Sequence, residues 1–162
     1  MEIPQAMLKN FLFMTGAESH PDLSRIVTET DMPDDLRMIA TLNKYVGDMS
    51  DHGVFRRDNV PYLFFSCGRW EHYHRVTDTP DRLSYPKMAR IAQLSADILE
   101  NVARESLGGS SEEDHTVEFE IKTLEDGLGV ALPFVLQQVG VSKLESREDL
   151  KKIVEAIMML GI

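Results

Sequence analysis

The stretch that decides the fold is residues 50–81, which read SDHGVFRRDNVPYLFFSCGRWEHYHRVTDTPD. At its centre, Tyr62 to Cys67 form an uncharged run that begins after Pro61 and stops at Gly68. Such a run, rich in aromatic residues, is typical of a strand buried on both faces of a sheet. Polar segments flank it on both sides. The sequence therefore predicts a buried strand with polar loops at its ends.

The flanking loops hold three histidines, His52, His72 and His74, and Asp51, Asp78 and Asp81 lie close to them in the sequence. Imidazole and carboxylate groups are the ligands that catalytic zinc prefers. A loop histidine is also commonly a surface or hydrogen-bonded structural residue, and two histidines without a third ligand hold zinc poorly. The residues alone leave both interpretations open, a metal site and a pair of structural loops.

Upstream of this stretch the pattern predicts strands alternating with helices. Residues 10–14 form an apolar run of strand length before Gly16, and Pro21 suits the first position of a helix that continues to about Thr28. Residues 36–42 fit a short strand, although their apolar positions also fit a helical stripe. We prefer the strand.

Downstream, a long amphipathic helix is predicted from Pro86 to a stop at Gly108 and Gly109. Its apolar residues recur at intervals of three and four: Met88, Ile91, Leu94, Ile98, Leu99 and Val102. The small, polar and acidic residues 108–114 then resemble a linker. The hydrophobic pattern resumes beyond them in a different register, which indicates a C-terminal extension.

The extension is predicted to be helical. Residues from 116 to about 129 fit a helix better than the strand that their partial alternation also permits, and Pro133 breaks or kinks the chain. Ser146 can cap a final helix through Leu160, with Asp149 at the capping-box position. Such helices offer a surface for docking on a partner.

Composition narrows the class of protein. The 162 residues, 43% hydrophobic, suit a single globular domain. A net charge of −10 argues against nucleic acid or an anionic membrane as partner, because either demands a basic face. Cys67 has no partner for a disulfide, and its apolar run predicts a buried structural thiol. We see no signal peptide or membrane-spanning run and expect a soluble chain, with its localisation unknown.

The motifs themselves resemble a known family. Three segments are similar in residue type, spacing and order to the C-terminal signature of metallopeptidase family M28. They are Ser50-Asp51-His52 with Phe55, then Pro61, then Tyr73-His74 with Asp78-Thr79 and Asp81. This family comprises double-zinc aminopeptidases and glutaminyl-cyclase-like relatives. The resemblance runs from about Asn10 to Ala103. It implies an α/β fold, part of a three-layer αβα sandwich, over residues 1–107, followed by a linker at 108–115 and a helical extension at 116–162.

The resemblance also implies roles for individual residues. His74 corresponds to the last ligand of the zinc pair, and Tyr73 to a residue whose hydroxyl donates a hydrogen bond to the oxyanion of the tetrahedral intermediate. Asp51 and His52 would lie at the rim of the metal centre and orient ligands or substrate. Asp78 would be a supporting carboxylate or a loop anchor, and Trp70 would line a side-chain pocket, but turn chemistry and ordinary packing explain these two equally well.

The family's remaining zinc ligands and its Glu-Glu pair, which supplies a ligand and the general base, have no counterpart in this chain. Glu112-Glu113 follows the signature and is not that pair. We therefore expect a C-terminal portion of a zinc-dependent aminopeptidase that binds zinc poorly and is inactive alone. Its partner would be the missing N-terminal half or a second copy, and a peptide would be substrate once the site is complete. The alternative is a non-catalytic assembly module; an independent hydrolase built on the three histidines is a weaker third hypothesis.

Overall fold

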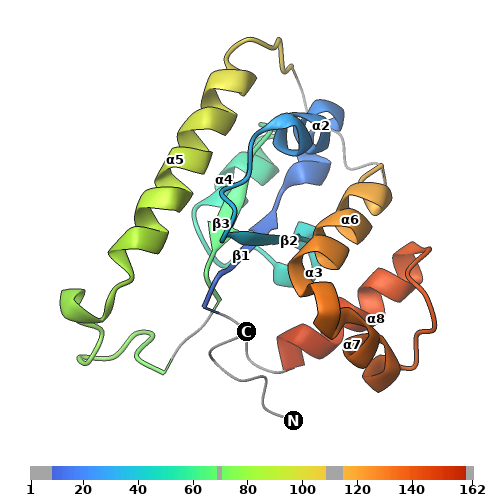
Figure 1. The fold of residues 1–162 in the computed structure, drawn as a ribbon. Coiled ribbons are helices and arrows are strands. Elements are labelled where there is room, and N and C mark those ends of the chain that lie inside the picture. Colours follow the sequence, from blue (N-terminus) through green and yellow to red (C-terminus); the bar gives the residue numbers. More distant parts are fainter. Residues whose placement is uncertain (1–8, 69–70, 109–114, 160–162) are drawn as a thin grey trace.

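A computed structural model describes residues 9–68, 71–108 and 115–159. Strands and helices alternate through the first two thirds of the chain and helices alone fill the rest (Figure 1). In chain order the elements are β1 (Phe11–Thr15), η1 (Ala17–Ser19), α2 (Pro21–Glu29), β2 (Arg37–Ala40), α3 (Asn43–Val46), α4 (His52–Arg57), β3 (Phe64–Ser66), η2 (Pro80–Arg82), α5 (Tyr85–Val102), α6 (Val117–Leu128), η3 (Gly129–Ala131), α7 (Leu132–Val139) and α8 (Arg147–Met159).

The sheet has the strand order β2-β1-β3 within the described residues. β2 runs parallel to β1, with Phe11 beside Arg37 and Met14 beside Ala40. β3 runs antiparallel to β1 and places Phe64 beside Thr15. The chain therefore enters β3 at the carboxyl end of β1 and leaves it toward the amino end, which decides where the flanking loops lie.

Two hydrophobic clusters cover the two faces of the sheet. Leu12 and Met14 of β1 pack with residues of α2 and α5, including Ile26 and Leu94. Their neighbour Phe11 belongs instead to a second cluster with residues of α6 and α8, such as Leu124 and Ile153. Because neighbouring strand residues point to opposite faces, the molecule has three layers, with α2 and α5 on one side of the sheet and α6, α7 and α8 on the other (Figure 1). This is the mixed α/β architecture expected for part of a zinc-peptidase fold.

Helix α6 closes the outer edge of β2. The backbone N–H of Ala40 donates to Oγ1 of Thr123 at 3.0 Å, where a further strand would otherwise supply a carbonyl. The guanidinium of Arg37 donates to the carbonyl oxygen of Gly127 at 3.3 Å, near the end of α6. A Cβ at Gly127 would lie 2.9 Å from Cγ1 of Ile39, so the glycine lets the helix approach this closely. The extension thus protects an edge that is otherwise prone to pair with another chain.

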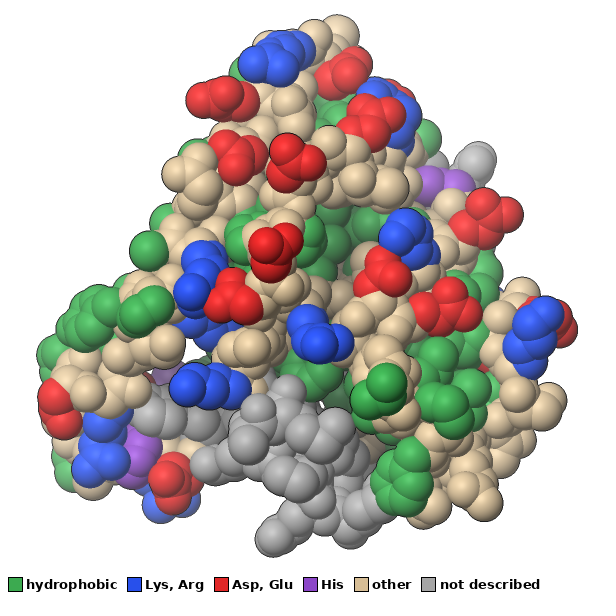
Figure 2. All heavy atoms as spheres, viewed as in Figure 1, with side chains coloured by type: hydrophobic (Ala, Val, Ile, Leu, Met, Phe, Trp, Pro, Cys, Tyr) green, Lys and Arg blue, Asp and Glu red, His purple; other side chains and the backbone are tan. Residues whose placement is uncertain are grey.

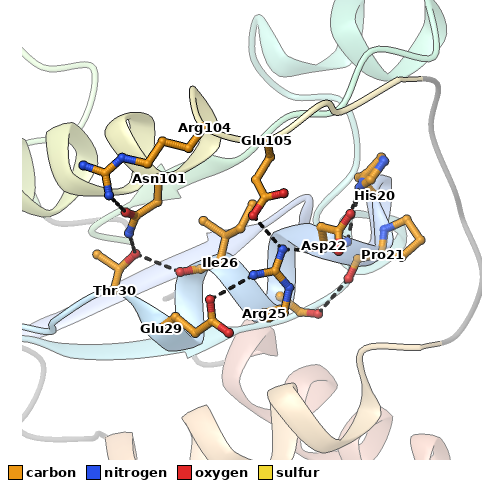
Figure 3. Close-up of polar contacts among 11 residues, drawn as sticks. His20, Pro21, Asp22, Arg25, Ile26, Glu29, Thr30, Asn101, Arg104 and Glu105 are labelled. Atoms are coloured by element: carbon orange, nitrogen blue, oxygen red, sulfur yellow. Dashed lines mark hydrogen bonds and ion pairs between the residues drawn. The ribbon is translucent and has the colours of Figure 1, made fainter.

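The carboxyl end of α5 is tied to α2 by polar contacts (Figure 3). Arg25 forms ion pairs with Glu29 and with Glu105, each at 2.9 Å. Asn101 donates from Nδ2 to the hydroxyl of Thr30 at 2.9 Å. The ion pairs are largely exposed and contribute little individually, but the contacts of Glu105 and Asn101 join the end of α5 to α2.

Several sequence predictions are confirmed. Residues 11–15 and 37–40 form strands, Pro21 begins α2, and the segments predicted as helices after Pro86, Thr116 and Ser146 are α5, α6 and α8. The Ser146 hydroxyl contacts the Asp149 carboxylate at 2.6 Å and accepts the Asp149 N–H at 3.3 Å, as a helix cap should. Pro133 lies in the first turn of α7, a separate helix.

Other predictions are wrong. The strand predicted at 62–67 covers only Phe64–Ser66 and is half-buried, because within the described sheet β3 is an edge strand that pairs with β1 alone. Cys67, just beyond its end, is exposed. α5 ends at Val102, earlier than the glycine pair, and Met88 and Leu99 of its predicted apolar stripe are exposed. The short helices α3 and α4 were not predicted. Residues 109–114 of the predicted linker and Leu160 lie outside the described residues.

Candidate functional site

The two motifs lie at opposite ends of the sheet. His52 stacks on Phe64, the first residue of β3, with ring centroids 4.3 Å apart, so the first motif is at the carboxyl end of β1. The chain between β3 and α5 leaves from the other end, where Nζ of Lys87 donates to the carbonyl oxygen of Phe11 at 2.6 Å. In Figure 1 this segment lies well away from α4. The structure therefore does not bring Asp51 and His52 together with Tyr73 and His74.

His52 is held inside the protein, at 5% exposure. Its Nε2 lies 3.0 Å from Oδ1 of Asn43 and 3.2 Å from the carbonyl oxygen of Gly47. Both partners are acceptors, so Nε2 carries a proton and donates to them. Its Nδ1 is buried and has no hydrogen-bond partner among the described residues. The ring thus links α3, α4 and β3.

Glu18 extends this network toward β1. Its carboxylate accepts the backbone N–H of Asn43 at 2.5 Å and that of Gly16 at 3.0 Å. Burial raises the pKa of the Glu18 carboxyl above its usual value, although the two N–H donors oppose the shift. Gly16 has φ +99°, and a Cβ there would lie 2.5 Å from the carbonyl oxygen of Tyr62, so this turn requires glycine.

A salt bridge at the surface completes this end of the sheet. Nδ2 of Asn43 donates to Oδ1 of Asp48 at 3.0 Å, which fixes the amide orientation that His52 needs. Arg56 binds the same carboxylate through two hydrogen bonds of 2.9 and 2.8 Å and lowers the pKa of Asp48 to about 2. Glu18, Asn43 and Asp48 were not predicted from the sequence to belong to a site. The sequence contains one sign of this network: Glu18 follows by two residues Gly16, the glycine that ends the first predicted strand.

Tyr73 and His74 lie on an exposed loop. The side chain of Tyr73 is 48% exposed and contacts the His74 ring edge-on, with centroids 4.0 Å apart. His74 is also exposed and has φ +57°, a left-handed conformation that non-glycine residues seldom adopt. Strained backbone of this kind clusters at functional sites, where the surrounding structure imposes it.

His72 imposes the shape of this loop. Arg82, which can only donate, lies with Nη1 2.9 Å from Nε2 of His72, so the proton is on Nδ1. That nitrogen donates to the hydroxyl of Thr77 at 2.9 Å. The backbone N–H of Asp78 donates to the carbonyl oxygen of Arg75 at 3.0 Å, which places Asp78 in a turn. His72 therefore closes the loop from within and leaves His74 on its outside.

The other residues singled out from the sequence lie apart. Asp51 is exposed and precedes α4 without a side-chain hydrogen bond to the helix end. The Asp78 side chain is exposed, and Trp70 lies outside the described residues. Among the residues that the structure describes, no three histidine, cysteine or acidic side chains form a group that could hold a metal ion. His74 alone does not make a zinc site, because catalytic zinc takes three protein ligands.

A groove of about 310 Å³ lies elsewhere, between α2, β2 and α6. Figure 2 shows a recessed hydrophobic area on this face with acidic and basic side chains around it. Its lining contains no residue of either motif: Val27, Thr28, Thr30, Met32, Asp34, Leu36, Arg37, Met38, Phe119, Lys122, Thr123, Asp126 and Gly127. The groove marks the seam between α6 and the sheet.

Comparison with known proteins supports the resemblance of the motifs. No curated protein and no solved structure matched the chain. None of the described helices has the length and apolarity needed to cross a membrane. The model of Peptidase family M28 matches residues 3–99, more than half of the chain, and ends within α5. The match includes both motifs, so the chain carries part of a peptidase domain and belongs to peptidase family M28.

Proposed function

We propose that this chain is the C-terminal portion of a zinc-dependent aminopeptidase-like domain, and that its Tyr73–His74 loop serves an active site to which residues outside the given sequence contribute. The observation that carries the proposal is the state of that loop within the matched residues 3–99. The His74 ring is exposed on a left-handed residue while His72 ties the loop together. A histidine held outward in this way is suited to bind a zinc ion that other residues also hold.

The roles follow from the side chains. The imidazole of His74 would supply one nitrogen to zinc, the metal on which peptide hydrolysis in this family depends. The Tyr73 hydroxyl, on the adjacent residue, would donate a hydrogen bond to the oxygen of the scissile carbonyl. The backbone N–H of Asp78 closes the turn that follows His74 by donating to the carbonyl oxygen of Arg75. Asp51 and His52 lie at the other end of the sheet, where they would support the fold. They would contact the zinc or the substrate only if the completed domain brought the two ends of the sheet together.

The isolated chain should be inactive. Catalytic zinc needs two protein ligands beyond His74, and the described residues bring no suitable pair to it. The resemblance also implies that the general base lies upstream of this sequence. The chain therefore lacks both the further zinc ligands and the general base. A peptide would become a substrate only once the remaining ligands and the general base complete the site.

A second candidate function is a non-catalytic assembly module. The packing of α6 favours it, because Thr123 satisfies the Ala40 N–H at the very edge where further strands would pair. In that case the chain keeps the fold, while Tyr73 and His74 serve no reaction.

A zinc titration separates these candidates. We would measure zinc affinity by calorimetry and hydrolysis of aminoacyl p-nitroanilides for the wild-type chain, His74→Ala and a control, His20→Asn. His20 lies outside the motifs and caps α2 by accepting the backbone N–H of Asp22, a role that asparagine can keep. The proposal expects weak zinc binding that falls in His74→Ala but not in His20→Asn, with no turnover by any of the three.

Two results would count against it. Stoichiometric zinc and turnover, both lost in His74→Ala, would show that the chain completes its own site. Zinc binding that is the same in all three proteins would remove His74 from the site and leave the assembly module.

A further inference from the structure

The groove between α2, β2 and α6 has a rigid apolar floor. Four of its lining residues, Val27, Leu36, Met38 and Phe119, are each at most 9% exposed, so the surrounding core holds their side chains in place. The volume of about 310 Å³ lies at the lower end of the range of about 300–1,000 Å³ that ligand sites occupy. The groove therefore suits a small ligand with an apolar part.

The hydroxyl groups along the groove already have partners inside the protein. Those of Thr28 and Thr30 donate to backbone carbonyl oxygens of α2 at 2.7 and 2.8 Å. The hydroxyl of Thr123 accepts the Ala40 N–H and donates to a carbonyl oxygen of α6, both at 3.0 Å. Recognition of a ligand in the groove consequently depends mainly on the charged side chains at its rim.

The charged residues in the lining are Asp34, Arg37, Lys122 and Asp126, and Figure 2 shows acidic and basic side chains around the recess. Lys122 and Asp126 form an ion pair at 2.6 Å and neutralise each other. Asp34 and Arg37 are exposed, and neither forms an ion pair within the described part of the chain. Of its five N–H groups, the Arg37 guanidinium uses those on Nη1, which donate to the carbonyl oxygens of Asp126 and Gly127 at 3.4 and 3.3 Å. The rim thus offers one carboxylate and one guanidinium to a ligand.

We propose that the groove binds a small zwitterion with an apolar side chain, that is, a free apolar amino acid or a short apolar peptide with both ends unblocked. Its side chain lies on the floor, its carboxylate accepts hydrogen bonds from Arg37, and its ammonium group pairs with Asp34. Guanidinium groups bind carboxylates through two parallel N–H bonds, which gives the contact direction as well as strength. A purely anionic ligand would be repelled by Asp34 and a purely cationic one by Arg37, so neither complements the rim as well.

This inference does not rest on the proposed function. The lining contains no residue of either motif, and it includes part of α6, which lies beyond the residues 3–99 matched to the peptidase family. Failure of the Tyr73–His74 proposal would therefore leave this one intact, and the reverse also holds.

The expected affinity is low. The core already covers most of the surface of the floor residues, and the two rim charges are exposed to solvent, where ion pairs contribute little. For a ligand of about nine non-hydrogen atoms, such as leucine, such contacts correspond to a dissociation constant on the order of 1–10 mM.

A series of ligands tests the three contacts one at a time. Leucine is titrated into the isotope-labelled chain, and the backbone amide shifts of Met38 and Thr123 in NMR spectra follow binding. A salt concentration of about 0.15 M screens the general attraction of an acidic protein for cations. N-acetylleucine lacks the positive charge, leucinamide lacks the negative charge, and glycine lacks the side chain. Each should bind at least about threefold more weakly than leucine.

Leucyl-leucine distinguishes the two sources of this chemistry. Tighter binding than that of leucine would support the proposal and assign the groove to the ends of short peptides. Weaker binding than that of leucine, with the order of the other ligands kept, would support it for free amino acids.

Substitutions at the rim test the assignment of the two charges. Arg37→Gln and Asp34→Asn should each weaken leucine binding about three- to tenfold, and Arg37→Gln should abolish the preference for leucine over leucinamide. Arg104→Gln is the matched control, since Arg104 is an exposed arginine just beyond α5 and outside the groove. All three positions are exposed, so the fold is kept.

Three results would overturn the proposal. The first is the absence of saturable binding up to about 50 mM leucine, well above the expected dissociation constant. The second is equal binding of leucine and leucinamide by the wild-type chain. The third is a loss of affinity in Arg104→Gln as large as that in Arg37→Gln.

Discussion

The two histidine motifs occupy opposite environments. His52 is buried, stacked on Phe64 and bonded to Asn43, in a network that reaches Glu18 on β1. His74 is exposed on a loop in a left-handed conformation, and His72 holds that loop in shape. Both motifs belong to one family signature, yet one of them supports the fold and the other presents a side chain to the outside.

This difference shows that membership of a motif does not by itself assign a role. A buried imidazole that shares its proton with an amide oxygen is committed to the structure, because breaking that bond leaves polar groups unsatisfied in the interior. An exposed imidazole has no such cost and is available for ligation. Environment therefore separates residues that the sequence treats alike, and measurements on the two ends of the sheet can test the separation.

The largest expected effect is on stability. His52→Ala should lower the free energy of unfolding by about 2–4 kcal/mol, because it leaves a cavity beside Phe64 and an unsatisfied Asn43 oxygen. His74→Ala should change it by no more than about 0.5 kcal/mol, as is usual for exposed positions. Urea denaturation of both variants beside wild type gives the comparison directly. Equal losses in the two variants would mean that the motifs do not differ in the way described here.

The next effect concerns pH at the buried end. The folded-state pKa of Glu18 is raised above its ordinary value of 4.5. The folded chain therefore holds this proton where the unfolded chain has released it, and the contribution of Glu18 to stability falls as pH rises from about 4.5 through the folded-state pKa.

Glu18→Gln tests this pH dependence, since glutamine does not titrate. The stability of wild type minus that of the variant should decrease with rising pH in that window and then level off. We would measure it by urea denaturation at several pH values from 4 upward. Asp48, whose pKa is lowered to about 2, titrates below this window and does not obscure it. A difference that is flat with pH would show that Glu18 is not perturbed by burial.

Much of the fold could be predicted because its signals are local. The apolar run before Gly16 and the spacing of apolar residues within α5 each reflect burial against a neighbouring layer. Both patterns can be recognised from a short segment of sequence alone. The strand at 62–67 was predicted longer and more buried than it is, since its aromatic residues do not reveal that only β1 pairs with it. The protection of the β2 edge by α6 was not predictable, because it depends on contacts between residues more than 80 positions apart.

The candidate site was predictable in its residues and not in its arrangement. The sequence identifies Tyr73, His74, Asp51 and His52 through their spacing, but only strand direction tells that β3 separates them to opposite ends of the sheet. The Glu18 and Asn43 contacts belong to no motif and require the parallel pairing of β1 with β2 to bring them together. Long-range pairing, which spacing does not encode, accounts for both failures.

The smallest effect tests whether His72 holds the exposed loop. Thr77→Val removes the acceptor of the His72 Nδ1–H bond while keeping the side-chain shape. Because the bond is exposed, global stability should fall by at most about 0.5 kcal/mol. The N–H groups of Arg75 and Asp78, which donate to carbonyl oxygens within the loop, should nevertheless exchange with solvent several-fold faster, since local opening becomes easier.

Amide exchange followed by NMR measures this opening, and Thr79→Val is the control, because the Thr79 side chain forms no cap bond to η2. Faster exchange confined to Thr77→Val would show that the His72 contact keeps the loop in the shape that directs His74 outward. If the two variants exchange alike, the turn holds its shape through backbone bonds alone. The contrast between the ends of the sheet would then rest on burial and not on how each loop is anchored.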